Sequence, residues 1–99
     1  MKLKPNKSAD FTKRLEADVI PLLRKQKGFQ DEIAFAANGG KEAFGISLWD
    51  RKESAEAYDR GDYSQVKKMM ENVIDGQAHV DGYEVSASTF LKAPAAELK

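Results

Sequence analysis

The chain has 99 residues, of which 41% are apolar and 32% are charged. This length supports one domain with one hydrophobic core, and the composition excludes a disordered or membrane-embedded chain. The 16 basic and 16 acidic side chains cancel and interleave along the sequence, so we expect no nucleic-acid partner. No cysteine is present, which excludes disulfides, thiolate metal sites and a cysteine nucleophile. The sequence has neither a signal peptide nor a spanning apolar segment, so we expect a cytoplasmic protein without membrane contact.

The first elements in chain order are a short strand and a helix. Residues 1–4 alternate apolar and basic side chains, and Pro5 ends this strand. Ser8 can cap the helix that follows, and Gly28 is typical of a helix stop. Pro21 removes one hydrogen bond inside this helix, so we expect a kink or a fresh turn there. The residues at helical spacing are Phe11, Leu15, Val19, Leu22 and Leu23.

A β-hairpin is predicted at the centre of the chain. Residues 29–37 and 43–49 have the composition of strands, and Asn38-Gly39-Gly40 lies between them. Asn and Gly tolerate the positive φ angles that a tight hairpin turn demands. This turn fixes the register of the two strands and therefore decides which of their side chains share a face.

The rest of the chain predicts a second helix and a last strand. Asp50 and Glu53 resemble a capping box at the start of a helix that breaks near Gly61 and ends at Gly76. Residues 80–90 have the pattern of the last strand. The order is βαββαβ, which predicts an α+β, ferredoxin-like antiparallel sheet with helices on one face. We expect one domain over residues 1–91 and a flexible tail over residues 92–99.

The predicted strands have two different faces, because successive side chains alternate. The more apolar face is predicted to lie under the helices; it carries Leu3, Ile33, Phe35, Phe44, Ile46, Leu48, Tyr83 and Val85. The other face is small and mildly polar; it carries Gln30, Glu32, Ala34, Ala36, Ala43, Gly45, Ser47, Trp49, Glu84, Ser86, Ser88 and Phe90. This second face is either a solvated surface or the place where a second sheet docks and encloses a cavity. Glu32 and Glu84 lie on this face: if buried, each would need a partner or would stay protonated, and the alternative is that both lie at the rim in water.

Three segments resemble antibiotic biosynthesis monooxygenase (ABM)-like proteins. Residues 19–29 (VIPLLRKQKGF) are similar to the first helix and the strand entry of that family, and residues 45–50 (GISLWD) with 53–58 (ESAEAY) are similar to its third strand and second helix. The resemblance covers residues 4–89. It implies a dimeric α+β barrel, in which two sheets pack face to face in a homodimer.

The family resemblance also bears on activity. It implies cofactor-independent monooxygenation of an aromatic compound, or haem degradation, or no catalysis. The haem-degrading members use a tryptophan and a histidine where this chain has Tyr58 and Lys68, and a first-strand asparagine that has no counterpart in residues 1–4. We therefore do not expect haem degradation.

The candidate site residues follow from the chemistry of single side chains. His79 with Asp81 forms a possible general base and its orienting carboxylate, although such a pair is commonly a solvated strand entry. Trp49 and Tyr58 are candidates to contact an aromatic ligand, although both side chains also suit core or interface packing. Ser47 and Ser86 complete the predicted binding set because they share the small-residue face. With one histidine and no acidic cluster at ligand spacing, we expect no metal site and no bound cofactor.

Two functional hypotheses remain open. The first is a cofactor-independent oxidoreductase, in which Trp49, Tyr58, Ser47 and His79 surround a small aromatic substrate that supplies electrons to oxygen. The second is a non-catalytic ligand-binding or stress-related protein that uses the same fold and the same homodimer. The lack of a matched catalytic set favours the second hypothesis.

Overall fold

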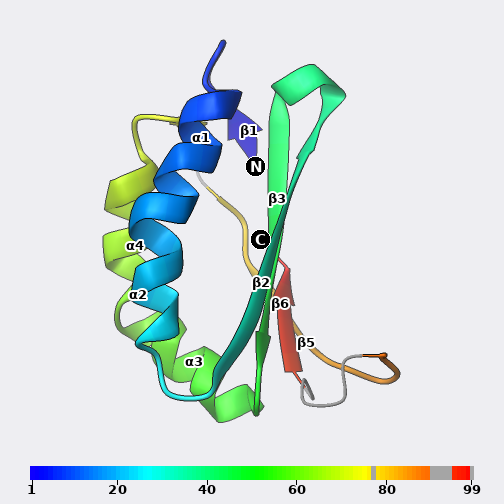
Figure 1. Ribbon diagram of the computed structural model, residues 1–99. Helices are drawn as coiled ribbons and strands as arrows, with labels where there is room; N and C mark the ends of the chain where they lie inside the picture. The colour runs from blue at the N-terminus through cyan, green and yellow to red at the C-terminus, as the bar shows by residue number, and fades with distance from the viewer. Residues whose placement is uncertain (77, 90–94, 99) are drawn as a thin grey trace.

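A computed structural model describes residues 1–76, 78–89 and 95–98 of the chain. It has two layers: an antiparallel sheet of six described strands, and helices that cover one face of that sheet (Figure 1). The predicted α+β class, with the helices on one side of an antiparallel sheet, is therefore confirmed. None of the helices in the described part is long and apolar enough to cross a membrane.

The N-terminal helix is one rod built from three segments, α1 (Ser8–Arg14), η1 (Leu15–Val19) and α2 (Ile20–Arg24). The middle segment η1 is π-helical: the Ile20 amide donates its hydrogen bond to the Leu15 carbonyl, five residues back. Pro21 follows directly and has no amide hydrogen for the carbonyl four residues before it. The predicted irregularity at Pro21 therefore takes the form of a widened turn.

The hairpin has the predicted position. β2 (Phe29–Ala37) pairs antiparallel with β3 (Glu42–Trp49), and the pairing places Ile33 opposite Ile46 and Phe35 opposite Phe44. The connecting turn η2 (Asn38–Gly40) holds three consecutive residues at positive φ, namely 54°, 64° and 85°. Asn and Gly adopt this conformation with little strain, which explains why the turn forms at this sequence.

The opposite edge of β3 is shared by two short strands. β1 (Lys2–Leu3) pairs with the start of β3, and β6 (Ala95–Leu98) pairs with its end. β4 (Ile74–Asp75) lies beside β1, and β5 (Asp81–Glu84) lies beside β6. The order is β4-β1-β3-β6-β5, with β2 on the other side of β3.

This arrangement differs from the sequence prediction in the last third of the chain. The predicted strand over residues 80–90 is shorter, because β5 ends at Glu84, and Phe90 lies outside the described residues. The predicted tail over residues 92–99 contains β6. Since β1 has only two residues, half of the edge of β3 remains open to another strand, and β6 occupies it.

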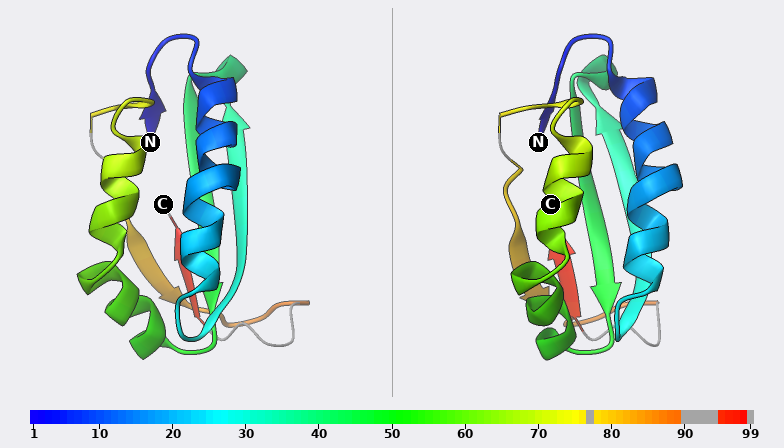
Figure 2. Two further views of the ribbon diagram at one scale, coloured as in Figure 1. Left: turned by 60° about the vertical axis from the view of Figure 1, so that its left-hand side comes forward. Right: turned by 90° about the vertical axis from the view of Figure 1, so that its left-hand side faces the viewer.

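Two further helices follow the hairpin. α3 (Lys52–Arg60) and α4 (Tyr63–Met70) are separated at Gly61, as the sequence predicted. Asp50 does not cap α3 with its side chain; its Oδ1 instead accepts a 2.8 Å hydrogen bond from the Ser54 hydroxyl. Figure 2 shows α4 beside the N-terminal rod, so that the two helices lie next to one another across the sheet.

The prediction of which sheet face lies under the helices is wrong. The small-residue face is the covered one: Ala43, Ser47 and Trp49 are almost completely buried. The more apolar face points away from the helices, and Phe35 and Phe44 on it are 41% and 38% exposed. Within the hairpin the predicted groups hold, because Ala34 pairs with Gly45 and Ala36 pairs with Ala43. Leu3 of β1 is an exception: it was grouped with Phe35 and Phe44, but it is 5% exposed and belongs to the core.

The reason for this inversion lies in the helices. The helices contribute most of the large side chains of the core, so the sheet beneath them needs little volume of its own. The buried helix residues are Phe11, Leu15, Val19, Leu23, Tyr58, Tyr63, Val66 and Met70. Counting apolar side chains on the strands therefore predicts the wrong face, because the count ignores the side-chain volume that the helices contribute to the core.

Replacing Gly28 by alanine is expected to destabilise the fold strongly. Gly28 has φ +83°, and a Cβ there would lie 2.2 Å from Asp50 Oδ1 and 2.4 Å from the Ser54 hydroxyl. Backbone strain and this clash together should lower the free energy of unfolding by about 3 kcal/mol or more. Urea denaturation followed by circular dichroism measures the loss.

Two glycines provide matched controls for Gly28. Gly39 also has a positive φ but has open space around it, so Gly39→Ala should cost only about 1 to 2 kcal/mol. Gly82 has neither a positive φ nor a neighbour within 4 Å, and Gly82→Ala should be nearly neutral. Equal losses for all three variants would contradict the proposed clash.

Candidate functional site

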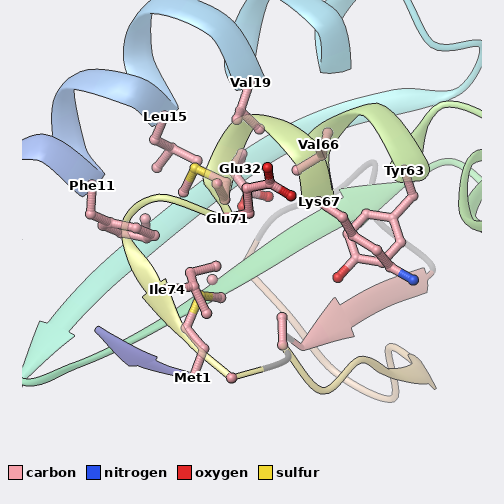
Figure 3. A pocket seen from close by; sticks show the side chains of 15 residues that line it. Met1, Phe11, Leu15, Val19, Glu32, Tyr63, Val66, Lys67, Glu71 and Ile74 are labelled. Carbon is pink, nitrogen blue, oxygen red and sulfur yellow. The ribbon is translucent and has the colours of Figure 1, made fainter. Parts of the chain in front are cut away.

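A cavity of about 310 Å³ lies between the helices and the sheet. The helical side of its wall comes from α1, η1 and α4; the apolar side chains there include Phe11, Leu15, Val19, Val66 and Met70 (Figure 3). Its volume is at the lower end of the range for small-molecule sites, and its mixture of mainly apolar with a few polar groups is typical of them. The cavity can therefore accept one small, largely apolar molecule.

The π-helical segment forms part of this wall. Leu15 and Val19, the first and last residues of η1, both line the cavity. A π-turn is wider than an α-turn and occurs frequently at functional sites. The irregular helix and the cavity thus coincide at the same residues.

The sheet side of the cavity is built from the small-residue face. Ala34 and Gly45, which pair across β2 and β3, leave space above the strands. Glu32, two residues before Ala34, projects its side chain from β2 into this space (Figure 3). The sequence prediction that a pocket lies on this face is consistent with the cavity, but helices enclose it, and not a second sheet.

Gly45 makes room for the Glu32 carboxylate. A Cβ on Gly45 would lie 2.8 Å from Glu32 Oε1, closer than real Cβ contacts permit. The second carboxylate oxygen, Oε2, is buried. Burial disfavours the charged form of a carboxyl group, and a hydrogen-bond donor or a positive charge beside it restores that form. Gly45 therefore helps to position this carboxylate at the wall of the cavity.

The remaining polar groups come from α4 and the residue that follows it. Tyr63, Lys67 and Glu71 all line the cavity, and their spacing of four residues places them on one face of this segment. Lys67 Nζ lies 5.1 Å from the centroid of the Tyr63 ring, which is a cation–π distance. Lys67 and Glu71 are exposed, so solvent screens their charges more than that of Glu32, which is partly buried.

A second hollow of about 210 Å³ adjoins the cavity at the edge of the sheet. Phe11, Leu15, Glu32 and Ala34 line both spaces. This hollow lies between the N-terminal helix and β2, whose Ala34 and Ala36 are too small to close it. Glu32 is thus flanked by the cavity on one side and by an opening at the sheet edge on the other.

Three of the predicted site residues come together beside the cavity and not in its wall. The Trp49 indole donates a 3.0 Å hydrogen bond to the Ser47 hydroxyl, and its ring lies 5.2 Å from that of Tyr58. Ser47 and Trp49 are fully buried, and Tyr58 is 2% exposed. Tyr63 lies 5.7 Å from Tyr58 and connects this cluster to the cavity. In this structure the three residues pack the core.

The other two predicted site residues lie apart from the cavity. His79 has a side chain that is 89% exposed, and its Nε2 lies 3.7 Å from Asp81 Oδ1. Ser86 is exposed in the bend after β5. Within the described ranges, no three His, Asp or Glu side chains are grouped so that they could hold a metal ion.

Sequence reasoning missed Lys67 and Glu71, and it considered Glu32 with Glu84 on the small-residue face without including either in the predicted site. The four-residue spacing of Tyr63, Lys67 and Glu71 was a usable signal, because it repeats once per helical turn. Glu32 was placed on the correct group of side chains, but its position under the helices depends on the face that they cover.

No known protein family, curated protein or solved structure matches this chain in the comparisons. The site is therefore assigned a function from its own geometry.

Replacing Ser47 by alanine is expected to destabilise the core. The substitution leaves the buried Trp49 N–H without its acceptor, which should cost about 1 to 3 kcal/mol of unfolding free energy. In a Trp49→Phe background the donor is already absent, so the same change should cost less. Circular dichroism during urea denaturation measures all three variants.

The control for this experiment is Ser86→Ala. Ser86 is exposed, so its substitution should change stability by less than about 0.5 kcal/mol. A Ser47→Ala variant as stable as Ser86→Ala would show that the indole hydrogen bond contributes nothing.

Proposed function

We propose that this protein binds one small aromatic molecule in the cavity between its helices and its sheet. The observation that supports this most directly is the position of Glu32, whose carboxylate projects from the sheet into an otherwise mainly apolar cavity. An apolar space with a few convergent polar groups is the usual design of a small-molecule site. The ligand would place its ring against residues such as Phe11 and Val66 and a hydrogen-bond donor against Glu32.

A second candidate function is cofactor-independent oxygenation of that molecule. Glu32 is placed to accept a proton from a bound phenol or enol, which would make the ring electron-rich enough to react with oxygen. Oxidation of a ring methylene to a carbonyl by O₂ releases water and needs no other reductant. Oxygen uptake in the presence of the bound compound separates an enzyme from a binding protein.

We propose further that the protein is an ABM-like homodimer with a ferredoxin-like plan. The central hairpin and the helices on one face support this relationship, while the two-residue β1 and the insertion of β6 beside β3 are departures from it. The apolar sheet face is the surface available to a partner copy, since helices cover the other face. Phe35 and Phe44 stack there with ring centroids 4.8 Å apart, and they adjoin the Ile33–Ile46 pair.

The apolar face suits a second copy of this chain for two reasons. Exposed apolar side chains gathered on one surface are typical of protein interfaces. The formal net charge of zero leaves little long-range repulsion between identical copies. A twofold axis through this face would pair each sheet with its partner sheet.

Filling the cavity with Ala34→Leu is expected to weaken binding of 2-naphthol, a neutral aromatic donor. The larger side chain occupies the space above β2 and should cost about 1 to 3 kcal/mol of binding free energy, or roughly ten- to hundredfold in Kd. Isothermal titration calorimetry measures the affinity.

Ala36→Leu is the matched control for this experiment. Ala36 lies on the same strand and the same face, but it lines only the hollow at the edge. This variant should bind 2-naphthol nearly as well as the natural sequence does. Unchanged binding by Ala34→Leu, or an equal loss in both variants, would place the ligand elsewhere.

A Phe35→Glu, Phe44→Glu double variant is expected to be monomeric. The two carboxylates would have to be desolvated in the interface between the sheets, which is unfavourable without partners. Light scattering coupled to gel filtration measures the mass in solution. Ala57→Glu, on the exposed surface of α3, should remain a dimer. A natural chain that is monomeric at micromolar concentration would contradict the proposed dimer.

A further inference from the structure

The cavity and the hollow at the sheet edge share part of their walls. Phe11, Leu15, Glu32 and Ala34 line both the space of about 310 Å³ and the space of about 210 Å³. The rest of the cavity wall extends toward α4, and the rest of the hollow wall extends along β2 and the N-terminal helix to the edge of the sheet. The two spaces therefore adjoin between Leu15 on the helix and Ala34 on the strand.

The strand side of this junction carries no large side chain. Ala34 lines both spaces, Ala36 lines only the hollow, and the residue opposite Ala34 on β3 is Gly45. Ala34 and Ala36 are exposed although they lie on the face that the helices cover, whereas Ala43, opposite Ala36, is almost completely buried. The helices thus leave the β2 edge of this face uncovered, and methyl groups alone cannot close the space up to the helix.

The helix side of the junction is apolar along its length. Leu15 lines both spaces, Val19 lines only the cavity, and Ile20 lines only the hollow. Figure 3 shows Leu15 and Val19 directed from the N-terminal helix toward the strands. Thr12 and Glu16, the polar side chains that this helix adds to the hollow, are exposed to solvent. A continuous apolar wall favours a ligand segment without hydrogen-bonding groups, because burying such a segment removes apolar surface from water.

From these observations we infer that the ligand of the cavity is an aromatic molecule with an unbranched alkyl chain, and that this chain passes between Leu15 and Ala34 into the hollow. This inference rests on the proposed function, since it specifies the shape of the molecule that the cavity takes. The ring occupies the cavity, and the chain lies along β2 toward Ala36 and Ile20. A ring alone would leave the apolar wall of the hollow in contact with water, and the chain covers that wall.

The test uses three phenols that share a ring and differ in the length of one chain: 4-ethylphenol, 4-butylphenol and 4-hexylphenol. NMR titration of the whole chain measures their affinities. Burying one methylene group improves affinity roughly fourfold, so each step of two carbons should tighten binding about tenfold. The signals of Ala36 and Ile20 should shift with 4-hexylphenol and not with 4-ethylphenol. Equal affinity for the three phenols would overturn the inference.

Variants locate the alkyl chain in the hollow. Ala36→Leu fills the hollow without entering the cavity wall, so it should weaken binding of 4-hexylphenol by about tenfold or more and leave 4-ethylphenol nearly unchanged. Ala37→Leu is the matched control, because it adds the same volume at the next position of β2 but lines neither space. This control should bind all three phenols like the natural sequence. Circular dichroism verifies that each variant is folded.

The outcomes separate this inference from the proposed function. If 4-ethylphenol binds and a longer chain adds nothing, the cavity is a ligand site but the assignment of the alkyl chain is wrong. If none of the three phenols binds to the folded protein, both the chain assignment and the small-molecule site are wrong. A gain with chain length that persists in Ala36→Leu would also overturn the assignment, because the chain would then lie on another apolar surface, such as the exposed face around Phe35 and Phe44.

Discussion

The helix-facing side of β3 carries Ala43, Gly45 and Ser47, and these side chains are too small to fill the layer above them. The helices compensate where their aromatic residues reach the sheet, and they leave a cavity where they do not. Close packing is the rule in protein interiors, so an unfilled volume of this size needs a local cause. The cause here is the lack of side-chain volume on one strand, and the placement of Glu32 follows from it because Gly45 gives its carboxylate room.

The C-terminal end and the middle of β3 have different surroundings. At its C-terminal end Trp49 packs against Phe29 from β2 and Tyr58 from α3; Trp49 and Tyr58 are almost completely buried, and Phe29 is partly buried. Toward its middle the same face borders the cavity. The aromatic cluster holds α3 against the sheet, and α4 continues from there across the cavity. The closely packed aromatic cluster therefore fixes the helices on the sheet next to the cavity, and a site supported in this way can hold a ligand in a defined position.

The sequence predicted the hairpin, the break at Gly61 and the irregularity at Pro21, because each depends on residues close together in the chain. Within the hairpin it also grouped the side chains correctly, since alternation is a local property. It failed on the face that the helices cover, because that depends on volumes contributed by Phe11, Tyr58 and other distant residues. The candidate site moved for the same reason: Trp49 and Tyr58 are closed in, while Glu32, Lys67 and Glu71 line the cavity. β6 could not be foreseen, since only the two-residue length of β1 opens its place.

The π-turn at Leu15–Val19 affects the shape of the helical wall of the cavity. A hydrogen bond from residue 20 to residue 15 encloses one residue more than an α-turn does, so everything after it is rotated by about 100° relative to a regular helix. Loss of a single residue in this stretch would restore the regular helix and turn Phe11 and Leu15 away from the side that now meets the sheet, while Leu23 stayed in place. The shape of the cavity thus depends on the number of residues between Leu15 and Leu23 as much as on which residues they are. A change in chain length, without any change in side-chain chemistry, would be enough to open or close it.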